Sequence, residues 1–88
     1  MEFKSELTQQ ELEKLYEDTE KTLLSEPSAR VGQALMINMD LDMYSRVTGT
    51  NCDPFYNSDN LSACIKKICP QHLHDIYVDK FNHLKKLR

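Results

Sequence analysis

Residues that interrupt helices are scarce in this sequence. Its 88 residues include two glycines, three prolines and no tryptophan. A chain of this length buries only about 60% of the surface that its unfolded form exposes, which is enough for one domain. It is too short for a Rossmann fold or a barrel, and for most self-contained enzymes, which need a scaffold and a deep cleft. The few interrupting residues, with many Leu, Lys, Glu and Met, favour helices.

Long apolar runs are also missing. The longest near-apolar stretch covers residues 34–37, whereas a membrane-spanning helix needs about 20 apolar residues. Residues 1–25 contain no apolar run that resembles a signal peptide. The cysteines, Cys52, Cys64 and Cys69, are odd in number. We therefore expect free thiols in a reducing cytoplasm.

The charge is distributed unevenly along the chain. Residues 1–26 carry eight acids and three bases, residues 27–60 carry four and two, and residues 61–88 carry two and six, which gives the net charge of −3. The acidic first part and the basic last part can attract each other or face different partners. The net negative charge argues against general nucleic-acid binding, which needs a basic surface.

The pattern predicts an all-α fold, a small bundle of four to five helices that forms a single domain over residues 1–88. The expected helices cover roughly residues 8–25, 29–38, 41–48, 59–68 and 70–87. Thr8 and Glu11 fit a capping box at the first start, and Ser28 and Asp40 are candidate N-caps for the second and third helices. Gly49 stands where a left-handed C-terminal cap belongs.

Apolar spacing indicates which side chains should be buried. In the third helix we expect Leu41, Tyr44 and Val47 to face the core. Gly32, inside the second helix, suggests a close approach between helices. The last expected helix carries an apolar stripe at Leu73, Ile76, Tyr77, Phe81, Leu84 and Leu87. The methionines Met36, Met39 and Met43 are best explained as core residues.

Catalytic and metal-binding patterns are weak. Cys52, Cys64, Cys69 and His72 could supply four zinc ligands, but they lack the paired spacing of zinc knuckles. Cys52 could pair with His72, His74 or His83, yet nothing in the sequence positions a base beside the thiol. We therefore expect no enzyme activity, no catalytic residue, no metal and no cofactor.

Two regions are candidates for partner binding. Asp53, Phe55 and Tyr56 lie in a proline-containing loop, where aromatic side chains often anchor an interface. Glu13, Glu17 and Glu20 share one side of the first helix and are explained by a solvated acidic face or by docking of a basic partner. We further expect a structural network in which Arg30 forms an ion pair with Asp53, assisted by Gln33. The basic residues Lys66, Lys67, Lys80, Lys85, Lys86 and Arg88 are interpreted as a solvated face.

The residues Arg30-Val31-Gly32-Gln33-Ala34, then Asn38, then Val47-Thr48-Gly49-Thr50 and Asp53-Pro54-Phe55-Tyr56-Asn57 form a motif. The motif resembles small uncharacterised proteins that are common in tailed-phage genomes and in some bacteria. Their pattern is R-x-G-Q-x-x-x-N, a short helix, then G-T-x-x-D-x-F-Y-[ND]-D, and it covers residues 30–60. This sequence departs from it with Ser58 before Asp59. The resemblance implies a phage or prophage origin and a host cytoplasm, and it brings no activity.

These observations lead to one preferred function and two alternatives. We expect a non-enzymatic phage-type protein that acts by stoichiometric contact with a host or phage protein. It would bind and modulate or inhibit a host protein, such as a defence or transcription protein. The first alternative is a homo-oligomeric module that binds a small anionic ligand such as a nucleotide, through Arg30, Tyr56 and the basic residues of the last helix. The second is a zinc-stabilised nucleic-acid adaptor. Neither a nucleic-acid nor a membrane partner is expected under the preferred function.

Overall fold

The fold is all-α, as the sequence predicts. The computed structural model describes residues 6–55 and 57–87, and within these ranges it contains five α-helices and no strand. The helices are α1 (Gln9–Ser25), α2 (Val31–Asn38), α3 (Leu41–Val47), α4 (Leu61–Ile68) and α5 (His74–His83). Three short 3₁₀ helices, η1 (Ser58–Asn60), η2 (Gln71–Leu73) and η3 (Leu84–Leu87), flank α4 and α5.

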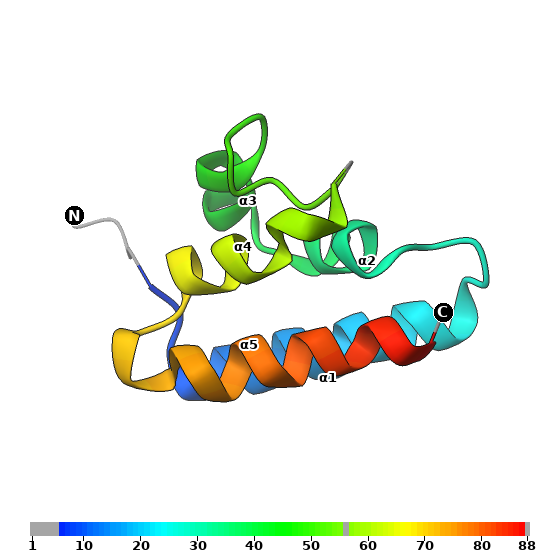
Figure 1. Ribbon diagram of the computed structural model, residues 1–88, viewed down its shortest axis with the longest axis horizontal. Coiled ribbons are helices and arrows are strands. Elements are labelled where there is room, and N and C mark those ends of the chain that lie inside the picture. The colour runs from blue at the N-terminus through cyan, green and yellow to red at the C-terminus, as the bar shows by residue number, and fades with distance from the viewer. Residues whose placement is uncertain (1–5, 56, 88) are drawn as a thin grey trace.

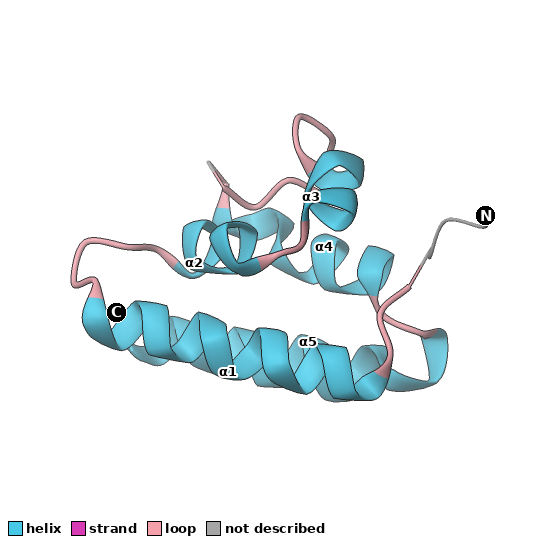
Figure 2. Cartoon of the chain, turned by 180° about the vertical axis from the view of Figure 1, so that it is seen from behind, coloured by secondary structure: helices cyan, strands magenta, loops and turns pink. Residues whose placement is uncertain are grey.

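The helices are arranged in two layers (Figure 1). The long helices α1 and α5 run side by side and in the same direction, and they form one layer. The second layer contains α2 and α4, with α3 on its far side, and the same arrangement is seen from behind in Figure 2. The molecule measures 39 × 25 × 20 Å. Among the described helices, none is long and apolar enough to span a membrane.

The first helix begins where its local sequence dictates. The Oγ1 atom of Thr8 accepts a hydrogen bond from the backbone N–H of Glu11 at 3.2 Å, and the N–H of Thr8 donates to Oε1 of Glu11 at 2.9 Å. This is the expected capping box, which uses two N–H groups that the helix cannot bond internally. The apolar side of α1 is buried at Leu12, Leu15 and Leu23.

Three helix boundaries differ from the prediction. The second helix begins at Val31, so Ser28 is not its N-cap, and Oε1 of Gln33 accepts the backbone N–H of Arg30 at 3.1 Å instead. The helix expected to start at residue 59 begins as η1 and becomes α-helical at Leu61. The last helix is α-helical only over His74–His83, because its first and last turns tighten into η2 and η3.

The orientation of α3 was predicted wrongly. Asp40 caps it as expected, accepting the N–H of Met43 at 2.9 Å. However, Met43 and Val47 are the side chains that enter the core, whereas Leu41 is 81% exposed and Tyr44 is exposed. Apolar residues occur on both sides of this short helix, so its own pattern does not determine which side is buried. Packing of Met43 in the core beside the other buried methionines, Met36 and Met39, decides it.

Two positions of the expected stripe on the last helix also lie outside the core. Ile76 and Leu87 are exposed, whereas Leu73, Tyr77, Phe81 and Leu84 are buried. α5 packs against α4 and α1 while the rest of its surface faces solvent, so a stripe this wide cannot be buried along its whole width.

Gly32 makes the close approach that the sequence suggests, but with a loop rather than with a helix. A Cβ atom at this position would lie 1.9 Å from the carbonyl oxygen of Pro54. That distance is far below any van der Waals contact, so only glycine permits the loop to pack against α2. The contact fixes the loop after α3 onto the outer side of α2.

Candidate partner-binding site

The loop that follows α3 is organised by Asp53. Its carboxylate accepts the N–H of Gly49 at 2.8 Å and the N–H of Phe55 at 2.9 Å. Gly49 has a φ of +75°, the left-handed conformation expected for it. The Phe55 side chain is half-buried and packs against the core. Asp53 and Phe55 therefore have internal roles in the loop, and their contact with a partner stays a prediction.

The predicted ion pair between Arg30 and Asp53 is wrong. Arg30 is exposed, and the described ion pairs do not join it to Asp53. The Asp53 carboxylate already bonds backbone N–H groups within its own loop, and the Gln33 amide bonds the start of α2. The expected network is therefore two separate local motifs. Tyr56, the other aromatic candidate, lies outside the described residues.

Glu13 joins the two long helices. Its Oε1 atom accepts a hydrogen bond from the hydroxyl of Tyr77 at 2.6 Å and from Nζ of Lys80 at 2.8 Å. The bonds from Lys80 and Tyr77 lower the pKa of Glu13. Burial and the bond to Glu13 raise the pKa of Tyr77 to about 12. Glu17 is exposed and Glu20 is half-buried, so the three acids of the expected face have different environments.

Two of the three thiols are buried. Burial raises the pKa of the Cys64 thiol to about 12 and also raises the pKa of Cys69, so both stay protonated at neutral pH. His72 is exposed, and Nε2 of His74 lies 2.8 Å from the carbonyl oxygen of Cys69. Within residues 6–55 and 57–87, no three metal-ligating side chains converge. The zinc site considered from spacing is therefore not assembled.

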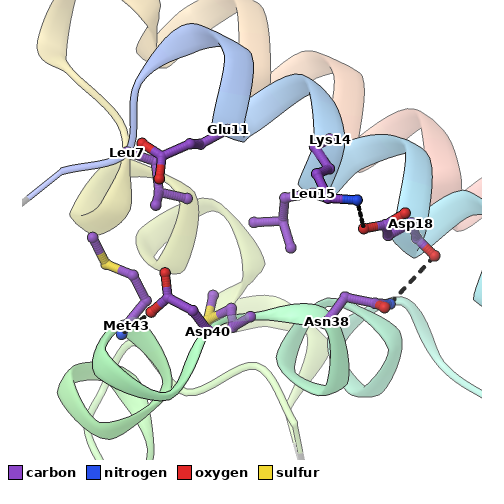
Figure 3. A pocket seen from close by; sticks show the side chains of 9 residues that line it. Leu7, Glu11, Lys14, Leu15, Asp18, Asn38, Asp40 and Met43 are labelled. Carbon is purple, nitrogen blue, oxygen red and sulfur yellow. Dashed lines mark hydrogen bonds and ion pairs between the residues drawn. The ribbon is translucent and has the colours of Figure 1, made fainter.

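A groove runs between α1 and the segment that joins α2 to α3 (Figure 3). It encloses about 190 Å³. Four buried apolar side chains line its floor, namely Leu7, Leu15, Met39 and Met43. Figure 3 shows Leu15 reaching in from α1, and Asp40 and Met43 from the opposite wall.

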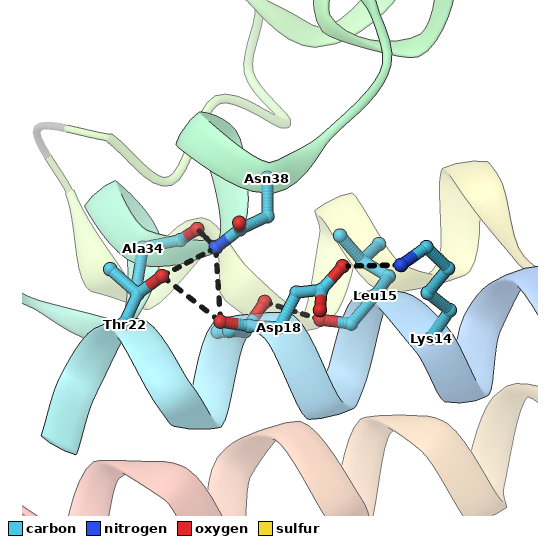
Figure 4. A network of polar contacts seen from close by, with 7 residues as sticks. Lys14, Leu15, Asp18, Thr22, Ala34 and Asn38 are labelled. Atoms are coloured by element: carbon cyan, nitrogen blue, oxygen red, sulfur yellow. Dashed lines mark hydrogen bonds and ion pairs between the residues drawn. The ribbon is translucent and has the colours of Figure 1, made fainter. Parts of the chain in front are cut away.

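Asn38 closes one end of this groove (Figure 4). Its Nδ2 atom lies 2.8 Å from the carbonyl oxygen of Ala34, 2.9 Å from Oγ1 of Thr22 and 3.3 Å from the carbonyl oxygen of Asp18. These bonds tie α2 to α1. A polar residue in the last turn of a mostly apolar helix is the signal in the sequence that points to this role of Asn38.

The polar residues of the groove are predominantly acidic. Glu11, Asp18 and Asp40 contribute carboxylates, and among the described lining residues Lys14 contributes a cation. Nζ of Lys14 lies 3.3 Å from Oδ2 of Asp18. Glu11 accepts the N–H of Thr8, and Asp40 accepts the N–H of Met43, so each of the three carboxylates has a partner within the fold.

Several large apolar side chains are exposed. The described residues include six of them, Leu24, Ile37, Leu41, Tyr44, Ile76 and Leu87. Three fall within eight consecutive residues, Ile37 near the end of α2 and Leu41 and Tyr44 on α3, and we call these three the α3 face. The sequence had predicted Leu41 and Tyr44 to be buried.

The site therefore belongs to a small all-α protein with an exposed apolar helix face and a narrow groove. Comparisons of the chain with protein-family models, with curated proteins and with solved structures give no match.

Proposed function

We propose that this protein acts without catalysis, by binding one partner protein in a stoichiometric complex through the α3 face. The observation that supports the proposal most directly is the exposure of Leu41, at 81%, together with Ile37 at 64% and Tyr44 at 36%. Leu41 and Tyr44 are three residues apart on one helix, so they lie on the same side of it.

The side chains of the α3 face keep apolar surface that folding leaves unburied. Burial of one large apolar side chain contributes about 1.5–3 kcal/mol. Single exposed hydrophobic residues are ordinary, but grouped ones mark interaction surfaces. Because Met43 and Val47 of the same helix are buried in the core, the backbone that carries Leu41 and Tyr44 is already ordered before binding.

The resemblance of residues 30–60 to small proteins of tailed phages suggests which kind of partner is bound. On that basis the partner is a host protein in the bacterial cytoplasm, of the defence or transcription machinery, and binding modulates or inhibits it. The motif residues Gly32, Asp53 and Phe55 would then preserve the shape of the domain, while the α3 face makes the contact.

A second candidate function has one specific observation in its favour. A hollow of about 390 Å³ is lined by Met43, Arg46, Lys67 and Ile68, and its two cations could hold a small anion such as a nucleotide phosphate. The Arg46 guanidinium already lies 3.4 Å from Oδ2 of Asp42, which offsets part of its charge. Of the residues first considered for this function, Arg30 is exposed at the start of α2, and Lys80 is bonded to Glu13 on the other layer.

Site-specific photo-crosslinking tests the preferred function. Benzoylphenylalanine replaces Leu41 in one variant and Ala63, an exposed residue of α4, in a control variant. We expect position 41 to crosslink one bacterial protein that position 63 does not, and the purified pair to form a one-to-one complex by light scattering.

Three results would count against the proposal. Identical crosslinks from both positions would show that the contact is nonspecific. A crosslink to a second copy of the chain would replace the heterologous partner with self-association. A purified complex that survives Leu41→Ser together with Tyr44→Ser would remove the α3 face from the interface.

A further inference from the structure

We propose that the outer face of the layer formed by α1 and α5 binds a second copy of the chain, so that the protein forms a two-fold symmetric dimer. This face lies on the side of the molecule opposite α3 (Figure 1). Dimerisation therefore leaves the α3 face open, and the inference does not depend on the proposed function. A complex with a partner protein would contain two copies of each, still in a one-to-one ratio.

The α1 side of the outer face carries two acids and a leucine. Glu17, Glu20 and Leu24 follow Glu13 by four, seven and eleven residues, so the four residues lie along one side of the helix. Glu13 is bonded to α5, so this side of α1 borders α5. Glu17 and Leu24 are exposed and Glu20 is half-buried.

The α5 side of the outer face carries bases and a leucine. His83 and Leu87 follow Lys80 by three and seven residues, and Lys80 is bonded to α1, so they lie on the side of α5 that borders α1. Lys86 follows His83 by three residues and lies in the 3₁₀ helix η3, where residues at that spacing are aligned. His83, Lys86 and Leu87 are exposed. Residues 80–87 include no acid.

The outer face leaves charges unpaired and apolar side chains exposed. Among the described residues, Glu17, Glu20 and Lys86 form no ion pair. The three large exposed hydrophobic side chains outside the α3 face all belong to this layer, namely Leu24, Ile76 and Leu87. A partner that fits must place bases opposite α1 and acids opposite α5, and it must cover the leucines. A second copy of the chain has all three properties.

The two helices of one chain define the register of such a dimer. They run in the same direction (Figure 1). Glu13 of α1 is bonded to Tyr77 and Lys80 of α5, which are 64 and 67 residues further along the chain. The ring of Tyr16 lies 5.5 Å from that of Phe81, and 81 − 16 is 65. A residue of α1 is therefore level with the residue of α5 that is numbered 64 to 67 higher.

A two-fold axis parallel to the helices makes the outer face complementary to itself. Such an axis brings α1 of each copy onto α5 of the other and keeps residues at the same level. Glu17 then faces His83 of the second copy, and Glu20 faces Lys86, because 83 − 17 and 86 − 20 are both 66. The same contacts occur twice, once on each side of the axis. The exposed leucines of the two sides meet near the end of the layer.

The area of the face suits a dimer that dissociates on dilution. With 17 residues, α1 is about 25 Å long, and two helices that are each about 10 Å wide give a face of roughly 500 Å². Stable interfaces bury about 800 Å² on each partner. We therefore expect a dissociation constant in the micromolar range, measured by sedimentation equilibrium. The mass should rise with concentration from the 10.3 kDa of one chain towards twice that value.

Reversal of charge tests which helix meets which. Glu17→Lys/Glu20→Lys makes the α1 side basic, and Lys85→Glu/Lys86→Glu makes the α5 side acidic. In the proposed dimer, each variant alone sets like charges against each other. Each should raise the dissociation constant at least about tenfold. If α1 instead met α1 of the second copy, neither change would create a new repulsion between the helices.

Mixing the two variants should restore the dimer. The basic α1 side of one chain then meets the acidic α5 side of the other, and the reverse contact pairs an acidic α1 with a basic α5. A misfolded variant would not form this heterodimer, so its recovery also excludes misfolding as the cause of the loss. The control Lys66→Glu/Lys67→Glu reverses two exposed charges of α4 and should dimerise like the unaltered protein.

Three results would overturn the inference. The unaltered protein could keep the mass of one chain at every concentration. The dimer could persist in either charge-reversal variant, or weaken as much in the α4 control, which would place the contact elsewhere. The two variants, each folded by circular dichroism, could fail to associate when mixed. None of these results affects the α3 face, which the crosslinking at position 41 tests separately.

Discussion

Two regions on either side of the α2–α3 corner use their side chains in opposite ways. One is the loop seam, formed by Gly32 of α2 with Asp53, Pro54 and Phe55 of the following loop. In the loop seam, Gly32 lies so close to Pro54 that no Cβ atom fits between them. The Asp53 carboxylate accepts two backbone hydrogen bonds. The other region is the α3 face, whose apolar side chains are exposed.

This difference separates structural residues from candidate functional ones. The loop seam contains residues 32 and 53–55 of the sequence motif, and the sequence predicts that Asp53 and Phe55 contact a partner. The geometry of the loop seam indicates that these motif residues hold the loop in its shape. The α3 face has no comparable internal role, so exchange of its side chains should alter binding while the fold persists.

Gly32→Ala should destabilise the protein by about 3 kcal/mol, because the new Cβ atom would overlap the Pro54 carbonyl and force the loop away from α2. Urea unfolding measures the change. Gly49→Ala is the matched control, since its Cβ would meet open space and the cost, about 1–2 kcal/mol, comes from the left-handed backbone alone. An equal loss in both variants would mean that the seam is not closely packed.

Asp53→Ala should cost about 2 kcal/mol, because the N–H groups of Gly49 and Phe55 lose their acceptor. Arg30→Ala should change stability by less than about 0.5 kcal/mol, as for other exposed positions. Thermal unfolding of both variants provides the measurement. A large loss of stability in Arg30→Ala would support the ion pair with Asp53 that the sequence suggested.

Two acids of α1 differ in the same way, because Glu13 is bonded within the fold and Glu17 is exposed, and the expected change in stability is smaller. Glu13→Gln should lose at most about 1 kcal/mol at pH 7, because its bonds to Lys80 and Tyr77 are partly exposed to solvent and therefore screened. Glu17→Gln, at an exposed position, is the control and should have no measurable effect.

The loss in Glu13→Gln should depend on pH in a defined direction. The pKa of Glu13 is lowered in the folded protein, so its contribution is fully present above its ordinary pKa of 4.5. That contribution disappears as the pH falls through the lowered pKa. Unfolding curves of the two variants should therefore converge with that of the unaltered protein in strong acid. A difference that grows with falling pH would contradict the assigned bonds.

Leu41→Ser should have the smallest effect on stability, within about 0.5 kcal/mol, because the side chain is mostly in water already. Met43→Ala, two residues along the same helix, should cost at least about 2 kcal/mol, since it opens a cavity in the core. Chemical denaturation of the pair tests the orientation of α3. If Leu41→Ser were the more costly change, α3 would be rotated and the α3 face would not exist.

Local signals in the sequence were sufficient for much of the fold. The capping box of Thr8, the N-cap of Asp40 and the left-handed Gly49 depend on residues within four positions, and all three are confirmed. Long-range features were harder to predict. The partner of Gly32 is a loop carbonyl 22 residues away in the chain, since 54 and 32 differ by 22.

The candidate site depends on the same kind of long-range information. A helix of seven residues with apolar side chains on both sides does not by itself encode which side enters the core. The groove exists because α1 and the α2–α3 junction, which are far apart in sequence, form its two walls. The sequence predicted Glu11 and Asp40 as capping residues and Met39 and Met43 as core residues, but it could not place them in one groove.

We propose that the α3 face, rather than the loop seam, contacts the partner. Amide hydrogen exchange of the purified one-to-one complex, compared with the free protein, tests it most directly. We predict additional protection at residues 37–45 and unchanged exchange at residues 49–55. Protection of residues 49–55 with unchanged exchange at residues 37–45 would contradict the account and return the interface to the loop that carries the motif.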